Sequence, residues 1–325
     1  MIVYRLGWTM ALLTVALALP ASAASAASAA SAASAASESA AQPFALQEVA
    51  PGVFVHFGRM LPLDAPGHDD IANIGFIVGE QCVAVIDTGG SMRIGRALRA
   101  AIKTRTRRPV CTVINTHVHV DHVLGNAAFS PDHPSFVGHA RLPAAIARNR
   151  LYFVSQYAGD LDQPASAQQI IAPDRLVQTT LELDLGGRRL SLRAWPTAHT
   201  DCDLTVFDEK TGTLWTGDLL FRERLPAVDG DVSGWLAVLD DLARIKVQRA
   251  VPGHGSLALD LAAALMPERA YLQALLEGVH EAIDQGQSMQ EALDHTAEAQ
   301  RPQWQLWDST HARNVARVYQ QLEWQ

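Results

Sequence analysis

A short polar motif, His117-Val-His119-Val-Asp121-His122, stands just after the apolar run Val110–Ile114 and constrains the fold of this chain more than any other segment. Imidazole and carboxylate groups are ligands that zinc, iron and manganese take from proteins. Side chains alternate along a strand, so a strand ending in this motif would send His117 and His119 to the same side, where they can bind one metal. Asp121 and His122 would lie past the strand end and can bind a second metal. A buried strand that delivers its end to a metal site is therefore expected.

Three later segments also combine a strand-like composition with a metal-binding residue just past their end. They are residues 190–195, 213–216 and 249–251, which lead to His199, Asp218 and His254 in turn. Each signal would be weak alone, because the chain has 12 histidines and a chance pair is ordinary. Their order after the first motif makes a shared metal site the expected interpretation.

The chain order His-x-His-x-Asp-His, then His, then Asp, then Gly-His-Gly resembles the metallo-β-lactamase superfamily, from about Gly52 to Ser256. The resemblance implies an α/β fold, a four-layer αβ/βα sandwich with metals at one edge of its sheets, here with extra C-terminal helices. It also implies two metal sites that share one carboxylate. Their ligands would be His117, His119 and His199 on one metal and Asp121, His122 and His254 on the other, with Asp218 bridging both. Ala198 departs from the pattern, because many relatives have glycine before the corresponding histidine.

The same resemblance implies roles for three aspartates. Asp121 and Asp218 are the expected catalytic carboxylates, and Asp218 would position a hydroxide and pass a proton to the leaving group. Asp87, in Val-Ile-Asp-Thr-Gly, would accept a hydrogen bond from the second nitrogen of a ligand histidine and fix its tautomer. The alternative for Asp87 is a cap on the helix that begins at Met92.

A carboxylate shared by two zinc ions favours hydrolysis. The pKa of water falls from about 15.7 in bulk to about 7 on zinc, so hydroxide forms near neutral pH. The expected activity is that of a dinuclear zinc hydrolase, in which a metal-bridging hydroxide attacks an ester, a thioester or a similar carbonyl. Three alternatives stay open: a class B β-lactamase-type lactam hydrolase, a mononuclear-iron persulfide dioxygenase, and a non-catalytic metal-dependent binding protein. Asp218 argues against the first, because that subclass normally lacks a carboxylate there.

Several short motifs resemble a narrower group, the exported quinoprotein relay system zinc metallohydrolases, or SoxH-like group. The motifs are residues 70–79, 87–91 and 222–230, and the C-terminal ending between 313 and 324. This narrower resemblance implies a functional link to periplasmic quinoprotein dehydrogenases. The superfamily resemblance implies two zinc ions per chain, with iron as an alternative metal, and a small-molecule substrate.

The N-terminus has the pattern of a targeting segment. Arg5, an uncharged apolar stretch over residues 6–20 and small residues up to Ala23 indicate a signal peptide over residues 1–23. Residues 24–43 are predicted to be an Ala/Ser low-complexity linker, and residues 44–325 the metallo-β-lactamase-fold domain, helical over 257–325. The expected location is periplasmic or secreted. No stable membrane span is expected after cleavage, because the apolar stretch is shorter than the roughly 20 residues of a span.

Net charge bears on the expected binding partners, and the surroundings of the cysteines bear on their expected state. The net charge is −8 and no basic block is present, so nucleic acid is not an expected partner. Cys82 and Cys111 lie in apolar, strand-like runs and are interpreted as small buried hydrophobic residues, with no disulfide assigned. Cys202, three residues after His199, is interpreted as a buried structural thiol rather than a ligand.

Hydrophobic periodicity predicts strands and helices along the whole domain. Strands are expected at residues 53–56, 74–85, 83–86, 110–114, 135–138, 181–195 and 204–216, and helices at 92–105, 142–157, 233–245, 257–286, 288–296 and 311–322. Hairpin turns are expected within three of the strand runs, at Gly79-Glu80, at Gly186-Gly187 and around residues 210–212. The mouth of the site is expected in loops 61–70, 155–172 and 222–234. In the last loop Arg224 could bind an anionic substrate group, but an ion pair with Glu223 or Asp229 is the favoured interpretation.

Overall fold

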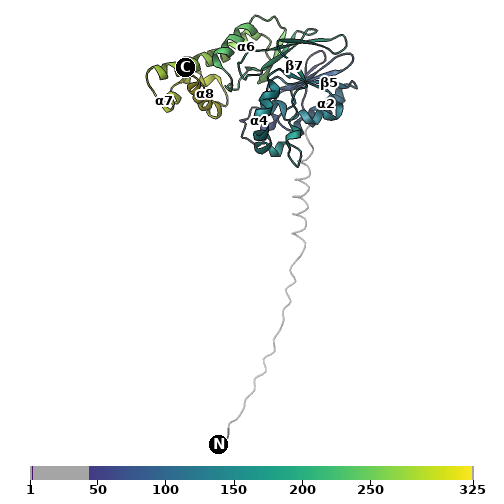
Figure 1. Cartoon of the computed structure of the whole chain (residues 1–325), viewed down its shortest axis with the longest axis horizontal. Helices are drawn as coiled ribbons and strands as arrows, with labels where there is room; N and C mark the ends of the chain where they lie inside the picture. Colours follow the sequence, from purple (N-terminus) through teal and green to yellow (C-terminus); the bar gives the residue numbers. More distant parts are fainter. Residues whose placement is uncertain (1, 3–43, 324–325) are drawn as a thin grey trace. The chain divides into compact units, whose positions relative to one another are not determined.

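The structure is a computed structural model that describes residue 2 and residues 44–323 (Figure 1). The expected signal peptide, residues 1–23, and the expected linker, residues 24–43, lie outside the described residues apart from residue 2. Among the helices of the described part, none is both long and apolar enough to cross a membrane.

The first sheet is built from strands that lie side by side in the order of the chain. They are β1 (Gln47–Ala50), β2 (Val53–His56), β3 (Ile74–Val78), β4 (Val83–Ile86), β5 (Val110–Ile114), β6 (Ser135–His139) and β7 (Arg175–Val177). Strands β1 to β4 pair antiparallel, and β4 to β7 pair parallel, with a crossover connection between each parallel pair. The edge strands β1 and β7, which the periodicity did not predict, are short and largely exposed.

The second sheet has the strand order β12-β11-β10-β9-β8. Its strands are β8 (Thr180–Asp184), β9 (Arg189–Ala194), β10 (Leu204–Asp208), β11 (Thr213–Phe221) and β12 (Arg249–His254). Only β11 and β12 pair parallel, and α5 (Val232–Leu242) connects them. Both strands run farther than predicted, so Asp218 and His254 lie within strands rather than past their ends. Their register shifts around Gly217, whose φ of 52° is a conformation that favours glycine.

The two sheets pack face to face, as the predicted sandwich requires. Their facing sides share one apolar core, to which Ile86 of the first sheet and Val206 of the second contribute. The helix α2 (Met92–Arg105) covers the outer side of the first sheet and has the predicted bounds. It begins after Ser91, whose side chain accepts a hydrogen bond from the Ile94 N–H, which stabilises the first turn.

The helices α5 and α6 (Leu261–Asp284) pack against β11 on the outer side of the second sheet. The helices α7 (Met289–Leu293) and α8 (Trp307–Leu322) pack against α6 in turn (Figure 1). A smaller core lies around α3 (Val120–Val123) and α4 (Leu142–Gln156). Short 3-10 helices complete the described part: η1 (His68–Asp70), η2 (Asn126–Asp132), η3 (Ala158–Asp160), η4 (Ala167–Gln169) and η5 (Glu298–Gln303). The predicted αβ/βα sandwich with extra C-terminal helices is confirmed.

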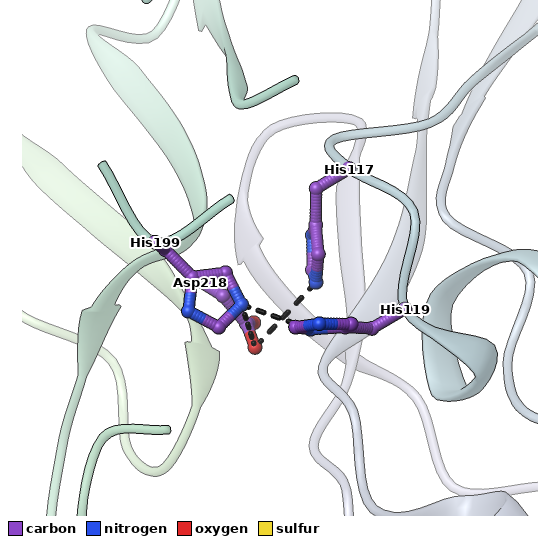
Figure 2. A group of neighbouring side chains, drawn as sticks. All are labelled: His117, His119, His199 and Asp218. Carbon is purple, nitrogen blue, oxygen red and sulfur yellow. Dashed lines mark hydrogen bonds and ion pairs between the residues drawn. The ribbon is translucent and has the colours of Figure 1, made fainter. Parts of the chain in front are cut away.

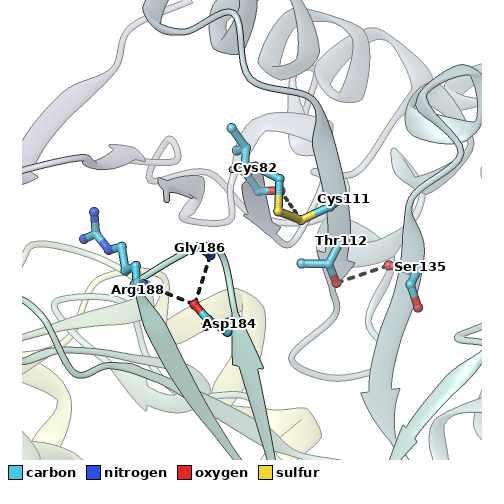
Figure 3. Close-up of a disulfide and its surroundings, with 8 residues drawn as sticks. Cys82, Cys111, Thr112, Ser135, Asp184, Gly186 and Arg188 are labelled. Carbon is cyan, nitrogen blue, oxygen red and sulfur yellow. Dashed lines mark hydrogen bonds between the residues drawn. A yellow bond between two sulfur atoms is a disulfide. The ribbon is translucent and has the colours of Figure 1, made fainter. Parts of the chain in front are cut away.

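A disulfide joins Cys82 and Cys111, so the interpretation of these residues as separate buried thiols is wrong (Figure 3). The two cysteines are 29 positions apart in sequence, but Val83 of β4 pairs with Val110 of β5. This pairing brings the cysteine Cα atoms to 5.7 Å, within the range that a disulfide spans. Cys202, in contrast, is free and buried, as predicted.

A buried arginine, Arg188 in the turn between β8 and β9, links the second sheet to the first. The Arg188 guanidinium donates to both carboxylate oxygens of Asp208 at 3.0 and 2.6 Å. Its Nη1 also donates to the backbone oxygens of Pro51 and Val78 at 3.1 and 2.9 Å. Arg188 follows the predicted turn at Gly186-Gly187, which has positive φ at both glycines (Figure 3).

Candidate metal centre

The first motif reaches the site from an irregular segment rather than from a strand. β5 ends at Ile114, and residues 115–119, with bends at 116–118, precede the single turn of α3. His117 and His119 therefore do not lie on one face of a strand, contrary to the prediction. The bends still bring them together, because their ring centroids are 4.8 Å apart. Asp121 and His122 lie on α3, which begins after this segment.

The three later candidates come from the second sheet. His199 lies in the loop after β9, whereas Asp218 lies inside β11 and His254 ends β12. Because β11 and β12 are neighbours, the Asp218 carboxylate lies 3.3 Å from His254 Nε2. Gly253 allows this approach, since a Cβ atom there would stand 1.8 Å from Asp218 Oδ1.

The first group of side chains consists of His117, His119, His199 and Asp218 (Figure 2). One candidate ligand atom from each residue lies within 4.8 Å of those of the others. His199 Nε2 is 2.9 Å from His119 Nδ1 and 3.4 Å from Asp218 Oδ2. His117 Nε2 is 3.6 Å from the same carboxylate oxygen. Three imidazoles and one carboxylate thus face a common point.

The second group consists of Asp121, His122 and His254, with ligand atoms again within 4.8 Å. His122 Nε2 and His254 Nε2 are 3.7 and 3.3 Å from Asp121 Oδ2. Asp218 also contacts this group, because its Oδ1 lies 3.1 Å from His122 Nε2. Asp218 is therefore the residue that the two groups share.

The spacing and the unpaired atoms fit a pair of metal ions. Two ligands about 2.0–2.1 Å from a tetrahedral metal stand roughly 3.3–3.4 Å apart, close to the separations within both groups. Among the described residues, the buried atoms His117 Nε2, His122 Nε2 and Asp218 Oδ1 form no hydrogen bond of acceptable geometry, although the last two lie 3.1 Å apart. Buried polar atoms normally have a partner, and a metal would supply one here.

The second ring nitrogen of each histidine is held by a neighbour, which aims the first one inward. The contacts are His117 Nδ1 to Thr116 Oγ1 (3.0 Å), His119 Nε2 to Asp229 (2.7 Å), His122 Nδ1 to Asp87 (2.8 Å), His199 Nδ1 to the Ala227 oxygen (2.8 Å) and His254 Nδ1 to the Ile71 oxygen (2.9 Å). Such partners set the tautomer and orientation of histidines that bind metals.

Asp87 lies beneath the second group. Besides contacting His122, its carboxylate accepts hydrogen bonds from the Thr116 backbone N–H at 2.9 Å and from the Thr116 hydroxyl at 2.7 Å. Asp87 does not cap α2, because the cap is Ser91. The Asp87 carboxylate therefore holds both His122 and Thr116, the residue directly before His117.

Asp229 is a positioning residue that the sequence alone did not identify. Its carboxylate accepts from His119 Nε2 and also pairs with Arg313 of α8. Arg317, one turn later on α8, donates to the Asp229 backbone oxygen at 2.8 Å. The C-terminal helix is thereby connected to a histidine of the metal centre.

Electrostatics in the centre favour a neutral His199 and ionised carboxylates. Burial disfavours the charged form of His199 and lowers its pKa to about 3. Burial raises the pKa of Asp218, but His254 and His122 outweigh this effect and hold that pKa well below its usual range. The pKa of Asp121 is lowered in the same way, against burial, by His122 and His254. His199 is neutral and both carboxylates are ionised, as metal ligands must be.

Against the effect of burial, Asp218 raises the pKa of His122 and of His254. Against the same effect, Asp229 raises the pKa of His119. These three rings would therefore give up a proton when a metal binds.

The site opens into a cavity of about 1070 Å³. Two of the predicted mouth loops line it with several residues, and loop 155–172 contributes Tyr157. Helices α4 and α8 form much of the remaining wall, which the sequence did not indicate. The favoured ion pairs of Arg224 are wrong: Glu223 pairs with Arg222, and Asp229 with His119 and Arg313.

Comparison with known proteins identifies a family and a fold. The family model described as the Metallo-beta-lactamase superfamily matches residues 68–254. A stereoselective inverting sec-alkylsulfatase from Pseudomonas sp. superposes with a TM-score of 0.67 and 18% sequence identity, covering 85% of this chain and 50% of that chain. A metallo-beta-lactamase family protein from Thermus thermophilus superposes with a TM-score of 0.60 and 22% identity, covering 85% and 94%.

A metallo-beta-lactamase from Pontibacter korlensis superposes with a TM-score of 0.58 and 19% identity, covering 70% of this chain and 98% of that one. At these identities the structures establish a shared fold. This chain spans half the length of the alkylsulfatase. None of the curated protein sequences compared with the chain matches it.

Proposed function

The chain belongs to the metallo-beta-lactamase superfamily, and from this premise we propose that it is a dinuclear zinc hydrolase acting on an ester, a thioester or a similar carbonyl compound. The observation that carries the proposal is the position of Asp218, whose two carboxylate oxygens contact histidines of both ligand groups. A carboxylate shared in this way is suited to bind two metals side by side.

The residues divide the work of hydrolysis among them. Two zinc ions bound by the groups would acidify a water molecule and polarise the carbonyl oxygen of the substrate. Asp218 would hold the attacking water in place and carry its proton to the leaving group. Asp87 and Asp229 would keep His122 and His119 oriented through their second nitrogens. Phe221, Phe153 and Tyr157 line the cavity and would limit access of bulk water.

A lactam substrate is less well supported than an ester or a thioester. A lactam would have to place its carboxylate or departing nitrogen beside the second ligand group. Asp218 already occupies that side, because it contacts both His122 and His254. We therefore expect little turnover of lactams.

Export is part of the proposal. The N-terminal pattern indicates a signal peptide, and the Cys82–Cys111 disulfide is of the kind that persists in oxidising compartments. A periplasmic or secreted location accounts for both observations. The assignment to the SoxH-like group and the link to quinoprotein dehydrogenases stay predictions from short sequence motifs.

Replacement of Asp218 tests the proposed function. Elemental analysis of the wild type should give close to two zinc equivalents per chain. Asp218→Ala should lower kcat/KM on a chromogenic thioester by more than about a hundredfold and weaken the binding of at least one zinc ion. Cys202→Ser is the control, because this thiol is buried in the core around α3 and α4, belongs to neither ligand group, and should leave zinc content and turnover intact.

Side-by-side assays on the thioester, an activated ester, nitrocefin and a secondary alkyl sulfate separate the reaction classes. A kcat/KM on nitrocefin of about 10⁴ M⁻¹s⁻¹ or more would favour the lactam hydrolase instead. One tightly bound iron and no second metal would favour persulfide oxidation. Two bound zinc ions without turnover of any substrate would favour a binding protein.

A further inference from the structure

The cavity above the metal centre is lined by four arginines, whose charges are not balanced in the same way. Arg148 pairs with Asp201, and Arg313 pairs with Asp229. Arg317 is exposed to solvent and donates to a backbone oxygen. Arg224 is half-buried, and among the described residues no carboxylate lies within ion-pair distance of it. Among the four arginines that line the cavity, Arg224 is therefore the partly buried one that lacks a counter-ion within the described part of the chain.

The neighbours that could neutralise Arg224 are already engaged. The Glu223 carboxylate accepts from the Ser256 hydroxyl and backbone N–H at 2.7 and 2.9 Å, and it pairs with Arg222. The Asp229 carboxylate is shared by His119 and an arginine of α8. Arg224 makes one side-chain hydrogen bond within the described part, from Nη1 to the Leu61 backbone oxygen at 2.6 Å. A guanidinium has five N–H donors, so most of those of Arg224 are available to a ligand.

The backbone around Arg224 is held in place by the segment before α8. The Leu225 N–H donates to the Gln305 oxygen at 3.0 Å, and the Gln305 N–H donates to the Glu223 oxygen at 2.7 Å. Arg224 and Gln305 themselves form an isolated parallel bridge. These contacts fix the backbone of Arg224, and the hydrogen bond to Leu61 orients its guanidinium, which lowers the entropic cost of binding a ligand there.

Metal binding would leave the positive charge of Arg224 even less compensated. Burial lowers the pKa of Arg224, and the negative charges of Asp121 and Asp218 partly offset that effect. The same carboxylates would be neutralised by the metals that they bind. Arg224 would then face a region of positive charge, and a partly buried cation in that position needs an anion from elsewhere.

We propose that Arg224 binds a carboxylate of the substrate remote from the scissile carbonyl, so that the preferred substrates are monoesters or monothioesters of dicarboxylic acids. This inference rests on the proposed hydrolase function. The guanidinium matches a carboxylate with two parallel hydrogen bonds. The apolar side chains of Leu63, Tyr152 and Phe153 line the same cavity and provide a surface for the carbon chain between the two ends of the substrate.

A matched pair of substrates tests the proposal on the zinc-loaded full chain. The 4-nitrophenyl monoester of adipic acid and 4-nitrophenyl hexanoate differ only in a terminal carboxylate against a methyl group. The wild type should prefer the adipate ester. Arg224→Gln should raise KM for that ester by about 10- to 100-fold, as expected for loss of a charge-assisted hydrogen-bonded pair. Its kcat, and both constants for the hexanoate ester, should stay within about threefold of the wild type.

Arg148→Gln is the control, because Arg148 lines the same cavity but already pairs with Asp201. This variant should leave the preference for the adipate ester unchanged. Arg224→Lys keeps the positive charge but not the paired hydrogen bonds, and should recover part of the preference.

Calorimetric titration with monomethyl adipate separates this proposal from the proposed function. The wild type should bind it, and Arg224→Gln should bind at least about tenfold more weakly, whether or not any ester is hydrolysed. Binding without hydrolysis would refute the hydrolase and retain the anion site. The proposal is overturned if the wild type treats the two esters alike, if it does not bind monomethyl adipate, or if Arg224→Gln weakens both esters equally.

Discussion

At the scale of single residues, the metal centre depends on partners that never touch a metal. Asp229 holds His119 at 2.7 Å through Nε2, which leaves Nδ1 to face His199. Removal of such a partner typically lowers metal affinity by about 10- to 100-fold, because the imidazole loses its fixed tautomer and orientation. Asp229 is thus as much part of the site as the ligands themselves.

Asp229→Asn should reduce the affinity of the first ligand group for zinc by about 10- to 100-fold, because an amide can accept from His119 but carries no charge. Competition with a chromogenic chelator measures this affinity directly. Asp231→Asn is a suitable control, because Asp231 lines the same cavity and caps α5 without contacting a histidine of the centre. Equal zinc affinities in the wild type and Asp229→Asn would refute the positioning role.

At the scale of elements, the parallel pair β4 and β5 supports the first part of the site. β4 leads to Asp87, and β5 leads to the segment that carries His117 and His119. The disulfide closes the chain between these strands, a separation of 29 positions. Closing a loop of this size restricts the unfolded chain and so stabilises the fold.

The double variant Cys82→Ser/Cys111→Ser should lower the free energy of unfolding by about 2–4 kcal/mol. Urea unfolding at a fixed zinc concentration measures the change. The folded variant should keep both zinc ions, because neither cysteine contacts a residue of the two ligand groups. Cys202→Ser controls for the loss of a sulfur atom. A variant as stable as the wild type would show that the disulfide is not formed.

At the scale of the whole molecule, the metal centre joins the two halves of the sandwich. The segment after β5 of the first sheet carries His117, His119, Asp121 and His122. The second sheet and the loop after β9 carry His199, Asp218 and His254. Metal ions bound by both sets would connect the halves at one edge. Ligand binding to the folded state alone stabilises it, so metal and fold stability are linked.

Zinc should therefore raise the midpoint of thermal unfolding of the full chain. At free zinc 100- to 1,000-fold above its dissociation constant, one site should contribute about 3–4 kcal/mol. Calorimetry over a series of zinc concentrations, with chelator-treated protein as the reference, measures the effect. Magnesium at the same concentrations is the control, because it disfavours sites rich in imidazole. A midpoint independent of zinc would contradict a site shared by both halves.

Local patterns in the sequence were sufficient for the central strands, most helices and the candidate ligands. The apolar run Val110–Ile114 and the spacing of apolar residues in Met92–Arg105 predict elements with the bounds that the structure shows. These features depend on neighbours a few positions away, and periodicity records such neighbours. The edge strands β1 and β7 escaped prediction because short, exposed strands carry little of that signal.

Tertiary structure alone decided which distant groups meet. Cys82 reaches Cys111 because β4 pairs with β5, and His119 reaches Asp229 across a separation of 110 positions. Contacts with Ser256 and Arg313, both distant in sequence, likewise engage Glu223 and Asp229, the two carboxylates that the sequence offered to Arg224. Such contacts depend on strand register and helix packing between segments far apart in the chain. No pattern within one segment records them, because each partner would look the same with another neighbour.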